Sequence, residues 1–373
     1  MTVALFDDFT DTVLGHHPDF TVGLANAAPT LAGADPVRLY CPPGYLDECP
    51  LRDGVVHRPT VGRSPGSVGV KLSYSRLVDP ANLAAASRDA AAHGASVFIN
   101  CYLDENYAAW PAAQTGLRYV HSLHRPGYFG LQVADHLGRL SLAELLTEIT
   151  PDGLFVVHSA AGERLASEFI DASRLVRSAW PAASRSEVAA WFDAAAVPTD
   201  DDPYLLSIGS ARSDKGTDLL MSALTEWHRL RIVGQQYQGM QAHLAGRHPH
   251  ARVEWETGWI SRQRLGQAIA GAAVIVFPYQ PEFTDYGGAS GALAQALTFG
   301  KPIIVSEVLA DQVPDSPACR VVPTGSAAAL RQAIDDALGD LPALHQAAGE
   351  LRKYVEEHHT YEGHLERILD RCG

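Results

Sequence analysis

The 373-residue sequence has few cysteines, no surplus of basic residues and no long apolar run. Its five cysteines are odd in number and form no CxxC pair, which argues against a disulfide framework or a zinc cluster and favours a reducing, cytoplasmic compartment. Lys and Arg number 29 against 43 Asp and Glu, so the net charge of -14 excludes a protein that binds nucleic acid by neutralising its phosphates. No apolar run approaches the ~18 residues of a membrane helix, and no integral membrane segment is expected.

Short apolar runs rich in Val and Ile alternate with helix-like segments along the chain. They begin at Val3, Val37, Ser96, Leu117, Leu154 and Arg174, and again at Tyr204, Leu230, Ala251, Ala273, Lys301 and Cys319. This alternation is typical of a parallel sheet covered by helices. We expect a helix between Asp79 and Gly94, because Asp79 can cap its start, Pro80 fits its first turn and Gly94 can end it.

The length of the chain suits two domains rather than one ordinary core. Between Pro181 and Pro203 the pattern breaks into a stretch with three prolines, an acidic run and no strand, which indicates a domain boundary. We therefore predict an α/β fold with two Rossmann-like domains, over residues 1–185 and 186–350. The C-terminal helices, over 351–373, are expected to pack back on the first domain.

Two segments of the second domain carry the residue types that bind phosphate. In IGSARSDKGTDLL a strand ends at Gly209, and Arg212 and Lys215 follow at the carboxyl edge of a parallel sheet, where open α/β folds bind ligands. In FPYQPEFTDYGGASGALAQALTFGKPIIVSE a strand leads through a loop into glycines at the head of a helix, where a phosphate can approach the backbone. The alternatives are a solvated loop for the first segment and a tight packing turn for the second.

Together the two segments resemble the donor-binding signatures of the family 4 retaining glycosyltransferases, which have the GT-B fold with two domains facing a cleft. The resemblance implies that Lys215 and a nearby basic residue hold the diphosphate of a nucleotide sugar, that Gly288 to Gly291 complete the grip, and that the backbone after Gly258 meets the base. The donor-site residues predicted in this way are Gly209, Ser210, Arg212, Lys215, Gly234, Gly258, Trp259, Ile260, Asp285, Tyr286, Gly287, Gly288, Ala289, Ser290, Gly291 and Gln295.

The sequence departs from the family pattern at three positions. The usual Arg after the strand glycine is Ser210, with Arg212 as its substitute two residues later. The two glutamates of the second signature are replaced by Gly287 and Gln295. Gln295 can still hydrogen-bond a ribose hydroxyl, and Asp285 could reach the space of the first glutamate.

The first domain resembles the family less closely. Gly15, His16 and His17 resemble the glycine-rich or His-bearing first loop of a subset of these enzymes. His121 and His124, in LRYVHSLHRPGYF, lie at or just beyond the end of a strand, and the resemblance implies a histidine near the transferred sugar. A packing role is the alternative for each histidine. The residues expected to act in catalysis are Arg212, Lys215, His121 and His124.

The resemblance implies a hexosyltransferase-type enzyme whose partners are a nucleotide-sugar donor and a small-molecule or glycan acceptor. Fixed cations at the diphosphate would replace a metal, so no metal and no cofactor are expected, and the outcome is expected to be retention. Asp200 to Asp202 are interpreted as a solvated turn rather than metal ligands. The alternatives are a non-catalytic nucleotide- or sugar-binding protein and an NAD-dependent oxidoreductase, since GGASGALA imitates a dinucleotide fingerprint. A monomer or homodimer is expected.

Overall fold

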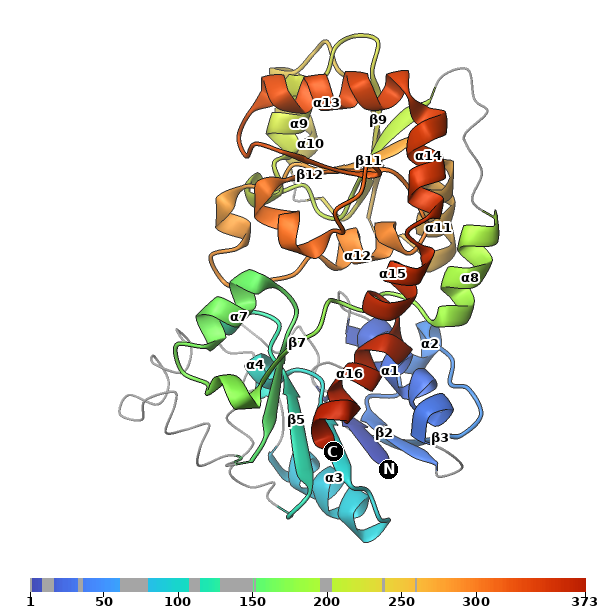
Figure 1. The fold of residues 1–373 in the computed structure, drawn as a ribbon, viewed down its shortest axis with the longest axis vertical. Coiled ribbons are helices and arrows are strands. Elements are labelled where there is room, and N and C mark those ends of the chain that lie inside the picture. The colour runs from blue at the N-terminus through green and yellow to red at the C-terminus, as the bar shows by residue number, and fades with distance from the viewer. Residues whose placement is uncertain are drawn as a thin grey trace. The chain divides into compact units, whose positions relative to one another are not determined.

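The computed structural model describes residues 2–8, 17–32, 36–60, 80–106, 115–127, 150, 152–194, 203–236, 239–258 and 260–373. The chain divides into two compact units, each built on its own parallel sheet (Figure 1). Unit 1 comprises Met1–Ser184, Tyr286–Ala289 and Thr360–Gly373, and unit 2 comprises Arg185–Asp285 and Ser290–His359. The predicted pair of parallel α/β domains is confirmed. Within the C-terminal segment 351–373, residues up to His359 belong to unit 2 and the rest to unit 1.

Unit 1 contains a seven-stranded parallel sheet in the order β3-β2-β1-β4-β5-β6-β7. Its strands are β1 (Val3–Phe6), β2 (Val37–Cys41), β3 (Val55–Pro59), β4 (Val97–Asn100), β5 (Arg118–Ser122), β6 (Leu154–Val157) and β7 (Leu175–Arg177). All except β3 lie where the apolar runs predict strands. The edge strand β3 was missed because its sequence, VVHRP, is partly exposed and lacks the apolar run of a strand buried on both faces.

Helices cover this sheet. They are α1 (His17–Ala32), α2 (Tyr45–Glu48), α3 (Pro80–Ala92), α4 (Leu103–Asn106), α7 (Ala160–Ala166) and α16 (Tyr361–Cys372), with the 3-10 helix η4 (Ala172–Arg174). Helix α3 begins at Pro80, and Gly94 follows it with a φ of +77°, as the sequence predicts. The last helix, α16, packs against α1, where a Cβ on Gly23 would lie 2.2 Å from the Tyr361 ring. Only glycine allows the two helices to approach so closely.

Unit 2 contains a six-stranded parallel sheet in the order β10-β9-β8-β11-β12-β13. Its strands are β8 (Tyr204–Ile208), β9 (Arg229–Gly234), β10 (Arg252–Thr257), β11 (Val274–Phe277), β12 (Ile303–Ser306) and β13 (Cys319–Val322). All six were predicted from the sequence. The central strands β11 and β12 are buried at every position, as expected for strands covered on both faces, whereas the edge strand β10 is partly exposed and carries charged residues.

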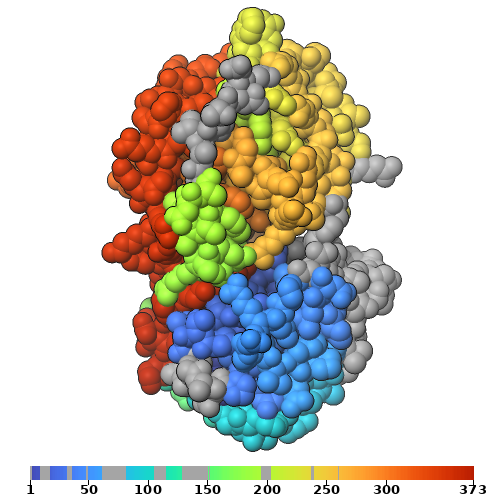
Figure 2. All heavy atoms as spheres, turned by 90° about the vertical axis from the view of Figure 1, so that its right-hand side faces the viewer, coloured from blue at the N-terminus to red at the C-terminus, as the bar shows by residue number. Residues whose placement is uncertain are grey.

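Eight helices and three 3-10 helices of unit 2 are described. They are α8 (Arg185–Ala194), α9 (Thr217–Ala223), α10 (Met240–Arg247), α11 (Arg262–Gly271), α12 (Gly291–Leu297), α13 (Ala327–Gly339), α14 (Leu341–Gly349), α15 (Arg352–His358), η5 (Ser213–Lys215), η6 (Pro281–Phe283) and η7 (Glu307–Gln312). Helix α8 lies on the surface, green in Figure 2, and packs against α15. Its Trp191 ring stacks on Phe299, with 4.2 Å between centroids.

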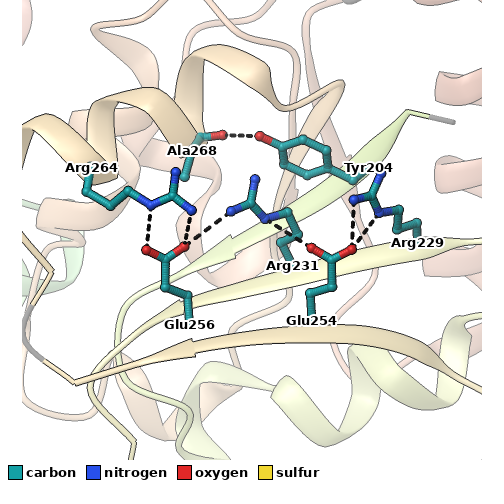
Figure 3. A network of polar contacts seen from close by, with 7 residues as sticks. All are labelled: Tyr204, Arg229, Arg231, Glu254, Glu256, Arg264 and Ala268. Carbon is teal, nitrogen blue, oxygen red and sulfur yellow. Dashed lines mark hydrogen bonds and ion pairs between the residues drawn. The ribbon is translucent and has the colours of Figure 1, made fainter. Parts of the chain in front are cut away.

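The edge strand β10 and its neighbour β9 carry a network of ion pairs (Figure 3). Arg231 lies directly opposite Glu254 in the register and reaches both Glu254 and Glu256. Arg264 of α11 adds a second guanidinium to Glu256, with Nε 2.6 Å from its carboxylate. The Arg231 guanidinium also lies 4.8 Å from the Tyr204 ring centroid. Alternating charges therefore hold the edge of this sheet in register.

In each sheet the strand order reverses beside the first strand of its unit, β1 in unit 1 and β8 in unit 2. At such a switch point the loops leaving the carboxyl ends of the two central strands run to opposite sides and leave a crevice, where open α/β sheets bind ligands. The candidate ligand-binding loops are therefore those after β1 and β4 in unit 1, and after β8 and β11 in unit 2.

Candidate functional site

The loop after β8 turns at two glycines that adopt positive φ. Gly209 follows the strand with a φ of +101°, and Gly216 ends η5 with a φ of +67°. A Cβ on Gly216 would lie 1.9 Å from the carbonyl oxygen of Pro278, so the loop packs backbone to backbone against the segment after β11. The Gln280 amide donates to the Asp214 carbonyl at 2.8 Å across the same contact. The two loops of the switch point are therefore joined.

Lys215 lies inside this junction. Its Nζ is 2.8 Å from the position that a Cβ on Gly209 would occupy, so the ammonium lies over the end of β8. It is also 5.5 Å from the ring centroid of Tyr279, which follows β11. The Tyr279 hydroxyl accepts a hydrogen bond from Ser290 Oγ at 3.2 Å. Tyr279 thus links Lys215 to the residue that precedes α12.

Arg212 has a different environment from Lys215. Its guanidinium forms a bidentate pair with the Asp214 carboxylate, in which Nε donates to Oδ1 at 2.8 Å. A guanidinium and a carboxylate in this geometry neutralise each other. Of the two predicted cations, Arg212 is paired within its own loop, whereas Lys215 faces a ring and a glycine.

The start of α12 is already capped by the protein. Ser290 Oγ accepts from the Leu293 amide at 3.2 Å, and the Ser290 amide donates to Gln312 Oε1 at 2.8 Å. The predicted glycine run is divided between the units, because Tyr286–Ala289 belong to unit 1 while Asp285, Ser290 and Gly291 belong to unit 2. Gly287 has a φ of +74°. Gln295 is partly buried in the second turn of α12.

The loops after β9 and β10, together with α10, border a cavity of about 640 Å³ that is open to solvent. Gly234 ends β9 with a φ of +138°, and a Cβ on it would lie 2.7 Å from the carbonyl oxygen of Gly209, so the loops after β8 and β9 touch. The described residues that line the cavity are Gln235, Gln236, Gly239, Gln241, Ala242, Ala245, Thr257 and Gly258. Gly258 has a φ of +106° and open space at its Cβ position. Ile260 is partly buried two residues later.

In unit 1 the two predicted histidines are both buried. His121 is 0% exposed at the end of β5, stacks at 5.3 Å on Phe155 and lies 3.2 Å from Thr150 Oγ1. Burial lowers the pKa of His121 to about 3, so its imidazole is neutral. His124 lies three residues further, just beyond β5, with Nε2 2.6 Å from the carbonyl oxygen of Cys101 and its ring stacked at 3.9 Å on Tyr102.

The loops after β1 and β4 gather acidic residues that sequence reasoning did not select. Asp7 is buried and accepts from Thr21 at 2.8 Å, with His17 Nδ1 3.1 Å away. Asp104 is buried, accepts from the His124 amide and lies 3.9 Å from the Arg125 guanidinium. Burial raises the pKa of the Asp104 carboxyl. The only signal in the sequence is that both acids follow an apolar run.

A smaller cavity of about 230 Å³ lies in unit 1 between the ends of β2 and β3 and helix α3. Its polar wall includes Tyr40, Arg58 and Asp89. Asp89 accepts from the Tyr40 hydroxyl at 2.7 Å and from Arg38 at 3.2 Å. The carboxyl edge of the unit 1 sheet therefore offers polar groups together with a small hollow.

Some predicted residues lie outside the described part of the chain, namely Gly15, His16, Trp259 and Asp200 to Asp202. Within the described ranges, no group of three or more His, Cys, Asp or Glu side chains is arranged to hold a metal ion. None of the helices described is long and apolar enough to cross a membrane.

A glycine-bearing loop with Lys215 lies at the switch point of the unit 2 sheet, which is the position where open α/β sheets bind ligands. Residues 202–340, which lie within unit 2 apart from Tyr286–Ala289, match the family model described as Glycosyl transferases group 1. No curated protein matches the chain.

Solved structures match over both units. Sucrose-phosphate synthase from Thermosynechococcus elongatus is 18% identical, with 100% of each chain covered and a TM-score of 0.68. A UDP-forming trehalose-phosphate synthase from Burkholderia xenovorans, in complex with glucose 6-phosphate, is 14% identical, with 100% of each chain covered and a TM-score of 0.67. Anabaena HepE, in complex with UDP and glucose, is 12% identical, with 100% of this chain and 99% of that one covered and a TM-score of 0.64. The fold is GT-B, and the findings together support a glycosyltransferase.

Proposed function

We propose that this protein moves a sugar from a nucleoside-diphosphate sugar to an acceptor hydroxyl, with Lys215 holding the donor diphosphate. The proposal is carried by the position of Lys215, whose ammonium lies over Gly209 and 5.5 Å from the Tyr279 ring, at the switch point of unit 2. This region falls within the match to the group 1 glycosyl transferases. The neighbouring cavity of about 640 Å³ has room for a nucleoside.

The chemistry follows from the charge that develops in the reaction. As the diphosphate leaves, negative charge grows on its oxygens while the sugar gains oxocarbenium character. A fixed ammonium therefore stabilises the transition state more than the ground state. Because Asp214 pairs with Arg212, we assign the main electrostatic role to Lys215. Arg212 would bind the diphosphate only if its guanidinium left the Asp214 carboxylate for the ligand.

We infer that the reaction proceeds with retention and without a metal, and that the acceptor is a small molecule or a glycan bound by unit 1. The support for retention is the resemblance of the two donor segments to retaining enzymes. The acceptor assignment is supported by the polar carboxyl edge of the unit 1 sheet, with Asp7 and Asp104. NMR of the product tests the stereochemistry, and an inverted anomeric centre refutes retention. Transfer that survives excess EDTA supports metal independence.

The first experiment is calorimetric titration of the protein with UDP, GDP, ADP and dTDP. HepE was solved with UDP, which makes UDP the first ligand to try. Lys215→Met should weaken the preferred nucleotide about 10- to 100-fold, since a charge-assisted contact contributes roughly 1.5–3 kcal/mol. Lys353→Met, at a side chain that is 87% exposed, is the matched control and should bind like wild type. Wild-type protein that gives no heat with any of the four refutes the proposal.

Two other functions are separated by simple assays. A binding protein without activity would bind the nucleotide but release no sugar from a nucleotide sugar over long incubation. An NAD-dependent oxidoreductase would enhance NADH fluorescence. Against the oxidoreductase, η6 intervenes between β11 and the glycine run, whereas a dinucleotide fingerprint runs from the strand directly into its glycines.

A further inference from the structure

The cavity beside the β8 loop has a polar side built from glutamines. Gln235 follows β9 directly, and Gln241 lies in the first turn of α10. Both line the cavity of about 640 Å³. Within the described residues neither side-chain amide has a protein partner. Both side chains are exposed to solvent, so each amide is accessible to a ligand.

The third glutamine of this cavity, Gln236, is already committed to the protein. Its Oε1 accepts from the Ala211 amide at 2.9 Å, and its Nε2 donates to the carbonyl oxygen of Gly234 at 3.1 Å. These two bonds fix the β9 loop against the β8 loop that carries Lys215. Gln236 therefore helps to fix the shape of the cavity, while the side-chain amides of Gln235 and Gln241 supply the polar groups that a ligand can contact.

The rest of the cavity suits a flat ring. On α10 the cavity is lined by two short apolar side chains, those of Ala242 and Ala245, beside the polar Gln241. Gly258 also lines the cavity and has open space at its Cβ position. A nucleobase has apolar faces and a polar edge, and short side chains and a glycine leave room for those faces.

We propose that the side-chain amides of Gln235 and Gln241 hydrogen-bond the polar edge of the donor's nucleobase. This inference rests on the proposed function, because a diphosphate at Lys215 directs its nucleoside toward this cavity past Gly209 and Gly234. A carboxamide donates and accepts side by side, so it can pair bidentately with a base edge that carries a donor beside an acceptor. Base selection then comes from side chains and not only from backbone groups.

The test compares nucleotides with inorganic pyrophosphate, which has no base. Gln235→Leu and Gln241→Leu replace each amide by an apolar group of similar size. Each variant should raise the Kd of the preferred nucleoside diphosphate about five- to tenfold, the usual effect of one neutral hydrogen bond. The double variant should raise it at least about 25-fold and should bind the four nucleotides with similar affinity. Gln263→Leu, at an exposed position of α11, is the matched control.

The outcomes separate this inference from the proposed function. Pyrophosphate binding that stays at the wild-type level shows that the variants are folded and that Lys215 still acts. If both single variants bind the preferred nucleotide within twofold of wild type, the glutamines do not read the base, although the proposed function stands. If wild-type protein binds pyrophosphate and every nucleotide equally, the cavity holds no base. If it binds none of them, the proposed function fails and this inference with it.

Discussion

Acid sensitivity of unit 1 is the prediction that the structure supports in most detail. His158 follows β6 and is 4% exposed, and its Nδ1 donates to the Ser178 carbonyl oxygen at 3.0 Å. Its ring lies 4.9 Å from Trp180 and 5.6 Å from His364 of α16. Burial lowers the pKa of His158 to about 4, and burial together with repulsion from a protonated His158 lowers the pKa of His364 well below its usual value. His121, with a pKa of about 3, belongs to the same unit.

The sign and size follow from proton linkage. An unfolded histidine binds a proton near pH 6.5, whereas folded His121 and His158 do so only near pH 3 and 4, so stability is highest above pH 6.5 and falls as the pH drops. Between pH 7.5 and 5.5 each of the two costs about 1.4 kcal/mol, or about 3 kcal/mol together. Asp104 acts in the opposite sense, because its raised pKa favours the folded protein as the pH falls.

The assay is urea unfolding followed by circular dichroism at pH 7.5, 6.5 and 5.5. In His158→Asn the Asn Nδ2 can replace His Nδ1 as donor to Ser178, and the variant cannot titrate. Its unfolding free energy should fall by about 1.4 kcal/mol less than that of wild type between pH 7.5 and 5.5. Asp104 contributes to both proteins, so the difference between them isolates His158.

The matched control is His243→Asn, at an exposed position of α10, which should follow the pH dependence of wild type. If His158→Asn loses stability as steeply as wild type between pH 7.5 and 5.5, then His158 is not held neutral by burial and the reasoning is wrong.

Two further predictions concern unit 2. Gly216→Ala should lower the unfolding free energy by at least about 2 kcal/mol, since φ is +67° and the new Cβ would lie 1.9 Å from the carbonyl oxygen of Pro278. The control is Gly246→Ala in α10, where the space around the Cβ position is open, and this change should be neutral or stabilising by up to about 1 kcal/mol. Urea unfolding measures both, and equal effects would contradict the packing argument. Arg231→Ala should cost about 1 kcal/mol by removing its ion pairs to Glu254 and Glu256 and its contact with Tyr204, and the cost should shrink in 1 M salt. A cost that is independent of salt would assign the effect to packing alone.

The fold could be predicted from the sequence because parallel strands covered on both faces read as apolar runs. Twelve strands were found in this way, and β3 was missed because it lies at an edge where part of the strand is exposed. The loop with Gly209, Arg212 and Lys215 could also be found, since its residues are contiguous and follow a strand. What the sequence did not reveal is that Asp214 pairs with Arg212, because that choice depends on how the loop folds.

The edge of unit 1 was harder to predict. Asp7 and Asp104 are far apart in the sequence, and they share an edge only because β1 pairs with β4 in the sheet. His121 and His124 looked equivalent as candidates, yet His121 faces Phe155 and Thr150 whereas His124 contacts Tyr102. The different environments of the two histidines depend on the strand order of the sheet and on the direction of each side chain, and the local sequence predicts neither.

The sequence by itself determined the parallel α/β architecture and the positions of the glycine-bearing loops, because apolar periodicity and the conformational needs of glycine are local properties. Tertiary structure alone decided that Lys215 lies against Gly209 and Tyr279, that three glutamines meet at one cavity, and that His158 is kept neutral. Burial and charge pairing depend on residues distant in the chain, and they fix which polar groups a ligand or a proton can reach.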